Sequence, residues 1–218
     1  MAPTFPHQFI AIEGNIGAGK TTLCKMLERD FQCRLVLEEF ADNPFLSYFY
    51  DNPERYAFPV ELFFLTERHK QLQEHLIQKD LFQETVVADY YFVKTLLFAK
   101  NNLNPEEYRL FQRLFHILNA SFPKPDLLVY LHRPVEQLVL NIQRRGRAYE
   151  QEIPPSYLAS IQESYQNFFR NAKDLPILMI DLGDCDFWNH EDQYLELTDM
   201  IRKKYEPGLH RRQLRHYI

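Results

Sequence analysis

Cysteine, glycine and long apolar runs are all scarce in this chain of 218 residues. The three cysteines, Cys24, Cys33 and Cys185, are odd in number and lack Cys-x-x-Cys spacing, so they support neither a disulfide framework nor a zinc site. No uncharged run approaches the roughly 18 residues that a membrane helix needs. The first apolar run meets Glu13 and a glycine too soon to be a signal peptide. We therefore expect a soluble, cytoplasmic protein with no membrane partner.

A surplus of positive charge is also missing. The 25 lysines and arginines face 30 acidic residues, which leaves a formal net charge of -5, so no overall basic field attracts nucleic acid. We expect no nucleic-acid partner. With 45% hydrophobic and 15% aromatic residues, the chain is too apolar for disorder and can fill a sizeable core. The length fits a single domain, residues 1–218, and no linker or repeat divides it.

Short apolar runs alternate with longer helical patterns along the chain. Five runs read as strands buried on both faces: Phe9–Ile12, Arg34–Leu37, Thr85–Ala88, Leu127–Leu131 and Ile177–Ile180. Helical patterns cover Lys20–Asp30, Pro53–Lys79, Tyr91–Lys100, Pro105–Ser121, Pro134–Arg145, Pro154–Lys173 and Asp192–Tyr205. This alternation predicts an α/β fold, with a five-stranded parallel sheet wrapped by helices. The basic tail His210–His216 is expected to be a solvated end.

The strongest chemical signal lies between the first strand and the first helix. The sequence GNIGAGKT is a full GxxxxGK[ST] motif in the order strand, loop, helix, which predicts a P-loop NTPase fold. Backbone N–H groups of such a loop surround phosphate oxygens, Lys20 reaches the β and γ phosphates, and the Thr21 hydroxyl binds Mg²⁺. The candidate nucleotide-binding residues are Gly14, Asn15, Ile16, Gly17, Ala18, Gly19, Lys20, Thr21 and Thr22.

Further segments, in the same order along the chain, resemble the deoxynucleoside kinase family. Glu38–Ala41 resembles the family's Glu-Pro-Val-Ala, and Tyr50–Glu61 follows its Tyr-x-x-Pro-x-x-Trp-x-Phe-x-x-Gln with two substitutions. Arg145–Gln151 resembles its arginine lid, and Asp186–Phe187 resembles the turn beside the adenine of ATP. The resemblance implies a thymidylate-kinase-like architecture, a short lid at about residues 144–152, ATP as phosphate donor with Mg²⁺, and a homodimer.

Glu38 is the catalytic base that this resemblance implies. A carboxylate at the carboxyl end of the second strand faces the crevice where open α/β sheets bind ligands, so it can accept the proton of an attacking hydroxyl. The alternative is that Glu38 caps the following turn. Arg145 and Arg147 would join Lys20 in neutralising charge on the transferred phosphoryl group. Their alternative is a basic helix end closed by Gly146.

Two charged residues interrupt an apolar helix face. Glu61 and Arg68 lie about two turns apart, and no helical neighbour of Arg68 at i±3 or i±4 is acidic, so we expect Arg68 to have an external partner. The resemblance implies that Glu61, Arg68 and Asp89 read the base. Guanine offers two acceptors to an arginine fork and two donors to an ionised glutamate, whereas adenine suits an amide better. We expect deoxyguanosine first and deoxyadenosine next. The alternative is a solvated helix face.

The sugar contacts also come from the resemblance. Tyr50 and Glu150 match the pair that holds the 3′-hydroxyl, and a tyrosine packed under the sugar would leave no room for a 2′-hydroxyl. The alternative is that Tyr50 fills the core.

The chain departs from the family at one motif. It has Gln83-Glu84-Thr85 where Glu-Arg-Ser is usual, so Glu84 is the candidate second Mg²⁺ ligand and Lys94 a candidate cation. We expect ATP-dependent phosphorylation of the 5′-hydroxyl of a purine deoxynucleoside in nucleotide salvage. A nucleoside monophosphate kinase is the nearest alternative, although Glu61 and Glu84 disfavour a phosphorylated acceptor. A nucleotide-dependent switch or a binding module is the alternative from another class.

Overall fold

Six strands form one parallel sheet at the centre of the molecule, in the order β2-β3-β1-β4-β5-β6. The computed structural model describes residues 4–38, 43–77, 85–120 and 122–215. The strands are β1 (Phe9–Gly14), β2 (Cys33–Val36), β3 (Thr85–Ala88), β4 (Leu127–His132), β5 (Pro176–Asp181) and β6 (Gly208–Gln213). Because all of them run in the same direction, their carboxyl ends meet along one edge of the sheet. The α/β fold is confirmed.

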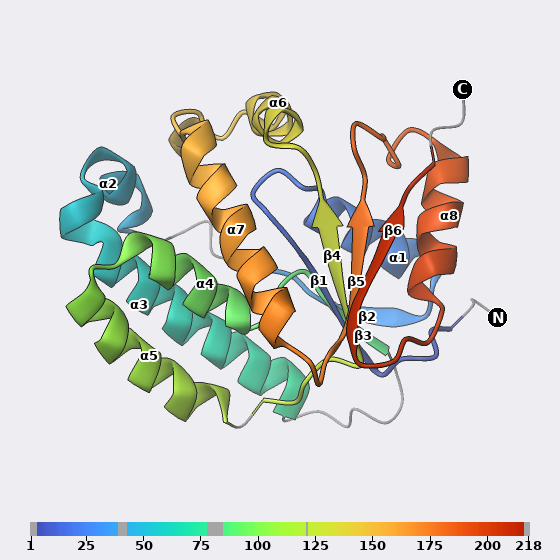
Figure 1. Cartoon of the computed structure of the whole chain (residues 1–218), viewed down its shortest axis with the longest axis horizontal. Helices are drawn as coiled ribbons and strands as arrows, with labels where there is room; N and C mark the ends of the chain where they lie inside the picture. Colours follow the sequence, from blue (N-terminus) through green and yellow to red (C-terminus); the bar gives the residue numbers. More distant parts are fainter. Residues whose placement is uncertain (1–3, 39–42, 78–84, 121, 216–218) are drawn as a thin grey trace.

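Helices cover both faces of this sheet (Figure 1). One face carries α3 (Pro53–Leu72), α4 (Val93–Asn102), α5 (Pro105–Asn119) and α7 (Pro155–Asn171), with the short α2 (Leu46–Asp51) beside them. The other carries α1 (Lys20–Asp30) and α8 (Glu191–Ile201). Helix α6 (Val135–Arg145) lies beyond the carboxyl ends of the strands and is followed by the short helical turn η2 (Ala148–Glu150). These carboxyl ends, α2, α6 and η2 therefore lie at the same end of the molecule.

Alternate residues of each central strand enter two separate cores. Leu127, Val129 and Leu131 of β4 pack with α1 and α8, whereas Leu128 and Tyr130 pack with α3, α4 and α7. Side chains of a strand point alternately to the two faces of a sheet, so a sheet covered on both faces needs apolar residues at every position. This explains the continuous apolar runs in the sequence.

The sixth strand corrects the expected count of five. β6 occupies most of the tail that was expected to be a solvated end, and it pairs in parallel with β5 at the edge of the sheet. Leu209 packs against the core, whereas Arg211 and Arg212 are exposed. An edge strand with one covered side needs no continuous apolar run, so the sequence pattern did not reveal it.

The long helical pattern from Pro53 is shorter in the structure than expected. Helix α3 ends at Leu72 and continues as a π-helical turn, η1 (Gln73–Ile77), while the rest of the expected helix lies outside the described residues. Helix α2 was not expected as a separate element. Among the described residues, the helices are too short or too polar to cross a membrane.

Candidate active site

The phosphate loop leaves the carboxyl end of β1 and leads directly into α1, which begins at Lys20. Gly17 has φ of 80°, and a Cβ there would lie 2.8 Å from the carbonyl oxygen of Leu138, so no larger residue fits. Lys20 Nζ donates to the carbonyl oxygen of Asn15 at 2.9 Å, which folds the side chain over the loop. Burial, together with the charge of Lys94, lowers the pKa of Lys20 to about 8. A helix N-terminus, a tight glycine turn and a lysine together suit a phosphate group.

A cavity of about 750 Å³ opens beside this loop, and we call it the second cavity. Of the expected nucleotide contacts, it is lined by Gly17, Gly19, Lys20, Thr21, Thr22, Asp186 and Phe187. Ile16 lines a different cavity, and Gly14, Asn15 and Ala18 line neither of the two. The side chain of Asn15 instead donates to the carbonyl oxygen of Leu158 at 2.7 Å, which ties the loop to α7.

The hydroxyl of Thr21 points at Asp89, which directly follows β3. Thr21 Oγ1 donates to Asp89 Oδ2 at 2.7 Å, and Asp89 Oδ1 accepts from the backbone N–H of Glu38 at 2.7 Å. Burial raises the pKa of Asp89, and the charge of Glu38 adds to this effect. Asp89, which was expected to read the base with Glu61 and Arg68, thus contacts the phosphate loop and does not line the cavity that those two residues share. β3 pairs with β1, so the residue after it faces the phosphate loop. Glu84, the expected metal ligand, lies outside the described residues.

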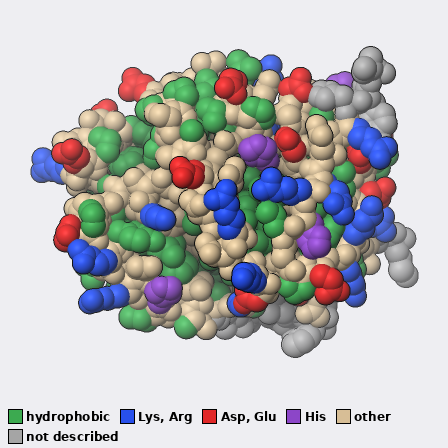
Figure 2. Space-filling model, in the orientation of Figure 1, with side chains coloured by type: hydrophobic (Ala, Val, Ile, Leu, Met, Phe, Trp, Pro, Cys, Tyr) green, Lys and Arg blue, Asp and Glu red, His purple; other side chains and the backbone are tan. Residues whose placement is uncertain are grey.

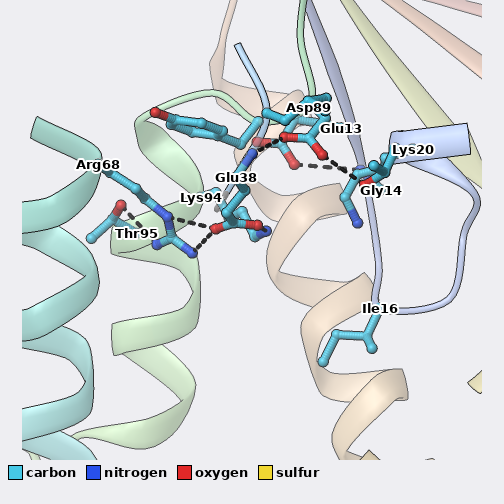
Figure 3. A network of polar contacts seen from close by, with 12 residues as sticks. Glu13, Gly14, Ile16, Lys20, Glu38, Arg68, Asp89, Lys94 and Thr95 are labelled. Atoms are coloured by element: carbon cyan, nitrogen blue, oxygen red, sulfur yellow. Dashed lines mark hydrogen bonds and ion pairs between the residues drawn. The ribbon is translucent and has the colours of Figure 1, made fainter. Parts of the chain in front are cut away.

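Glu38 is held between two cations (Figure 3). Its Oε1 accepts from Arg68 Nε at 2.9 Å and Nη2 at 2.5 Å, and its Oε2 accepts from Lys94 Nζ at 2.5 Å. Burial alone would raise the pKa of Glu38, but the charges and hydrogen bonds of Lys94 and Arg68 outweigh it and hold the pKa well below its usual range. The external partner expected for Arg68 is therefore Glu38. Arg68 Nη1 also donates to Thr95 Oγ1 at 3.0 Å, so a buried hydroxyl of α4 helps to hold the guanidinium in place.

Glu38, Lys94 and Arg68 line a cavity of about 320 Å³, the first cavity, which extends along α3 to Glu61. Glu61 is only 2% exposed, and its Oε1 accepts from Asn102 Nδ2 at 2.6 Å. No described residue donates to its buried second oxygen, Oε2. Burial raises the pKa of Glu61 to about 7 against the opposing effects of Asn102 and Arg68. When the carboxyl group is ionised, Oε2 is therefore an acceptor that no described residue uses, on a residue that lines this cavity.

Aromatic rings form much of the wall around these polar groups. The rings that line the first cavity belong to Phe49, Tyr50, Phe64, Phe98, Tyr149 and Tyr157. Arg68 lies over the ring of Phe64, with its guanidinium carbon 4.8 Å from the ring centroid. A small cavity with aromatic walls and a few buried polar groups suits a flat heterocycle.

The arginine segment connects the two cavities. Helix α6 ends at Arg145 and is closed by Gly146 in the left-handed conformation, as the alternative reading expected. Arg145 and Arg147 nevertheless both donate to the buried carboxylate of Glu150, the latter from Nη1 to Oε1 at 3.3 Å. Arg147 lines both cavities, whereas Glu150 and Tyr50 line the first. Glu150, one of the two expected sugar contacts, thus accepts from both expected lid arginines.

Glu13 is a buried acid that sequence reasoning did not assign to the site. It ends the apolar run of β1, where its Oε1 accepts from the backbone N–H of Tyr91 at 2.6 Å and its Oε2 from the hydroxyl of Tyr165 at 2.7 Å. Burial raises its pKa. Glu13 therefore ties the strand before the phosphate loop to the segment after Asp89. The only sequence signal is a carboxylate inside an otherwise apolar strand.

The geometry agrees with the comparisons to known proteins. A family model described as deoxynucleoside kinase matches residues 10–205. The deoxyguanosine kinase of Bacillus subtilis is 37% identical over 202 residues, which cover 89% of this chain and 96% of the relative. The deoxyadenosine/deoxycytidine kinase of the same organism is 28% identical over 205 residues, covering 89% and 92% of the two chains.

The solved structures agree in fold. The structure of deoxyadenosine kinase from M. mycoides with bound dCTP superposes with a TM-score of 0.74 at 23% identity, covering 88% of this chain and 97% of the other. The same enzyme with bound dATP gives 0.76 at 22% identity, covering 89% and 100%. Since the family model spans nearly the whole chain, the chain belongs to the deoxynucleoside kinase family and is a phosphotransferase.

Proposed function

We propose that this kinase transfers the γ phosphoryl group of ATP to the 5′-hydroxyl of a purine deoxynucleoside in nucleotide salvage, with deoxyguanosine preferred and deoxyadenosine next. The observation that carries the proposal is that Glu61 and Arg68 both line the first cavity. The ionised carboxylate of Glu61, whose Oε2 no described residue uses, matches guanine N1–H and N2–H, and the guanidinium of Arg68 matches the acceptors O6 and N7.

Glu38 accepts the proton of the 5′-hydroxyl in this proposal. Because Lys94 and Arg68 hold its pKa low, Glu38 is ionised at every physiological pH and orients the hydroxyl as an acceptor. A strong base is not required, because phosphoryl transfer passes through a loose transition state in which positioning and charge stabilisation supply most of the rate. Lys20, Arg145 and Arg147 supply positive charge from the side of the donor.

Thr21 and Asp89 are the proposed Mg²⁺ ligands, with Asp89 in the role first expected of Glu84. Their hydroxyl and carboxylate oxygens, 2.7 Å apart beside the phosphate loop, are the hard donors that Mg²⁺ prefers. Bound there, Mg²⁺ would neutralise charge on the β and γ phosphates of ATP. The adenine would lie beside Asp186 and Phe187, which also line the second cavity.

A homodimer through the α4–α5 side completes the proposal. Leu110 and Ile117 lie two turns apart on α5 and are 51% and 72% exposed, and Figure 2 shows hydrophobic side chains among lysines and arginines on this side of the molecule. Large exposed apolar residues on one helical stripe are typical of a subunit interface.

A substrate panel tests the reaction. The purified protein is given Mg-ATP and each of the four deoxynucleosides or dGMP, and the phosphorylated products are separated and quantified. We expect deoxyguanosine to give the highest kcat/KM, deoxyadenosine the next, and dGMP none. Faster turnover of a pyrimidine deoxynucleoside or of dGMP would contradict the proposed substrate.

A single substitution tests the base reading. Gln at position 61 offers one donor and one acceptor, which match adenine, so Glu61→Gln should shift the ratio of kcat/KM for deoxyguanosine to that for deoxyadenosine by about ten- to a hundredfold toward adenine. Glu54→Gln is the matched control, because it makes the same change at an exposed position of the same helix. An unchanged ratio in the Glu61 variant would remove Glu61 from base recognition.

A further inference from the structure

Arg133, the first residue after β4, joins two loops that both face the second cavity. Its side chain is buried, with the residue 6% exposed, and its guanidinium donates to three backbone carbonyl oxygens. Nε reaches Ala18 in the phosphate loop at 3.3 Å. Nη1 and Nη2 reach Gly183 and Cys185 at 3.2 Å and 2.8 Å, in the loop after β5. That second loop carries Asp186 and Phe187.

The same two loops also contact each other directly, close to the guanidinium of Arg133. A Cβ at Gly19 would lie 3.2 Å from Cζ of Phe187, so the ring packs on the phosphate loop at its last glycine. The guanidinium carbon of Arg133 lies 5.9 Å from the centroid of the Phe187 ring. The backbone carbonyl of Arg133 accepts from Gln162 Nε2 at 2.6 Å, which anchors it to α7. Arg133 is thus fixed at its backbone and holds both loops with its side chain.

Burying this guanidinium is costly, because none of its three acceptors carries a formal charge. Burial lowers the pKa of Arg133, although the nearby acids Asp184 and Asp186 oppose the effect. An apolar side chain would fill the same space without that cost. Only the planar fork of arginine presents donors in several directions at once, so it can reach carbonyl groups on two separate loops.

We propose that Arg133 is a positioning residue for the phosphate donor: it fixes the phosphate loop and the Asp186–Phe187 turn at the spacing at which one ATP molecule contacts both. The proposal rests on the proposed function in one respect, namely that ATP occupies the second cavity. ATP then binds as a ligand with two linked ends, and its affinity depends on how well the two subsites are placed for simultaneous contact. A ligand that touches one subsite has no such dependence.

The test uses calorimetry to compare the Kd of a ligand that contacts both subsites with the Kd of a ligand that contacts only one. The probes are a non-hydrolysable ATP analogue, inorganic tripolyphosphate, which occupies the phosphate loop alone, and deoxyguanosine, which occupies the first cavity. For Arg133→Met we expect the Kd of the ATP analogue to rise about tenfold, as expected for lost hydrogen bonds from a charged group, with less than twofold change for the other two probes. In turnover, KM for ATP should rise while KM for deoxyguanosine stays constant.

Two further variants separate the role of the guanidinium shape from that of its charge and provide a control. Arg133→Lys keeps the charge but has a single ammonium in place of the fork, so it should lose nearly as much affinity for the ATP analogue as Arg133→Met. Arg202→Met is the control, because Arg202 also lies 5.9 Å from an aromatic centroid, that of Phe31, but lines neither cavity. It should change no Kd.

Three results would overturn the proposal. Equal weakening of tripolyphosphate and the ATP analogue would mean that Arg133 acts through its charge. Equal weakening of all three probes with a lower Tm would mean that it acts on the fold. Full affinity of Arg133→Lys for the ATP analogue would mean that the fork is not needed. If the unchanged protein fails to bind the ATP analogue, the proposed function itself is wrong, which is a separate outcome.

Discussion

At the scale of single residues, Glu61 has two chemical forms near neutral pH. Its burial raises the pKa to about 7, so the carboxyl group is largely protonated below that pH and largely ionised above it. The ionised form has acceptors only and matches the two donors on the edge of guanine. The protonated form has one donor and one acceptor and matches adenine N1 and N6. The preferred base should therefore depend on pH.

We expect the ratio of kcat/KM for deoxyguanosine to that for deoxyadenosine to rise as pH increases from 6 to 8. The change should be about tenfold and centred near pH 7, since one mismatched donor–acceptor pair costs about that much. Parallel pH profiles with the two nucleosides measure it. In Glu61→Gln, which does not titrate, the ratio should stay flat. A ratio that is constant or falls with pH in the unchanged protein would contradict the role of Glu61.

Glu38→Gln should lower kcat by about 10²- to 10⁴-fold, because the amide accepts no proton from the 5′-hydroxyl. Binding of deoxyguanosine, measured by calorimetry, should change far less. The variant also leaves Arg68 and Lys94 without their anionic partner, so thermal melting must show that it is folded at the assay temperature. Glu54→Gln again serves as the control. An unaltered kcat would show that Glu38 is not the catalytic base.

The sequence predicted some of these residues better than others. Helical spacing put Glu61 and Arg68 on one face and required an outside partner for Arg68, which is Glu38 in the structure. Asp89 was expected beside Glu61 and Arg68, but it contacts Thr21 of the phosphate loop and does not line the first cavity. Its position depends on β3 pairing with β1, a long-range contact that local spacing does not encode. Thr95 was missed because a threonine near the start of a helix carries no distinctive signal.

At the scale of elements, α3 holds the ends of two strands through Gln71. Gln71 Nε2 donates to the carbonyl oxygen of Leu37 at 2.6 Å, and Gln71 Oε1 accepts from the hydroxyl of Tyr90 at 2.6 Å. The backbone N–H of Glu38, the residue after Leu37, donates to Asp89 Oδ1 at 2.7 Å. The segment that carries Glu38 is therefore held on both sides, by the helix and by the neighbouring strand end.

Gln71→Met should remove the contact with the helix while keeping a side chain of similar length. Glu38 would then be less well placed, and we expect kcat to fall about tenfold while KM for both substrates stays within twofold, because small misplacements of reacting groups act mainly on the chemical step. Steady-state kinetics measure this split. The control is Gln73→Met at an exposed position just beyond α3. A rise in KM without a fall in kcat would instead mean that Gln71 shapes the cavity.

Elements with strong local signals were predicted well. Helix α1 and strand β3 have the bounds that the sequence predicted, because a glycine loop precedes the helix and every residue of the strand is buried. β6 was missed because its exposed arginines give no apolar pattern, and its strand geometry comes from pairing with β5. The buried strands of the sheet can be predicted from the sequence, whereas the edge strand β6 depends on tertiary contacts.

At the scale of the whole molecule, we expect a homodimer in solution. Leu110→Glu combined with Ile117→Glu places two charges on the proposed interface and should convert the dimer to monomer, as measured by sedimentation velocity. Leu195→Glu is the control, since Leu195 lies on α8 and is 53% exposed, close to the 51% of Leu110. A protein that sediments as a monomer before any substitution would contradict the prediction, as would a double variant that stays dimeric.

The two cavities together define where the molecule should hold its two substrates. A crystal structure of the protein with deoxyguanosine and ADP would test both positions directly. We expect guanine N1 and N2 within hydrogen-bond distance of the Glu61 carboxylate, and the 5′-oxygen beside Glu38. The phosphates of ADP should lie on the loop at Lys20. A nucleoside bound away from Glu61, or with its 5′-oxygen turned away from Glu38, would contradict the assignment of both residues.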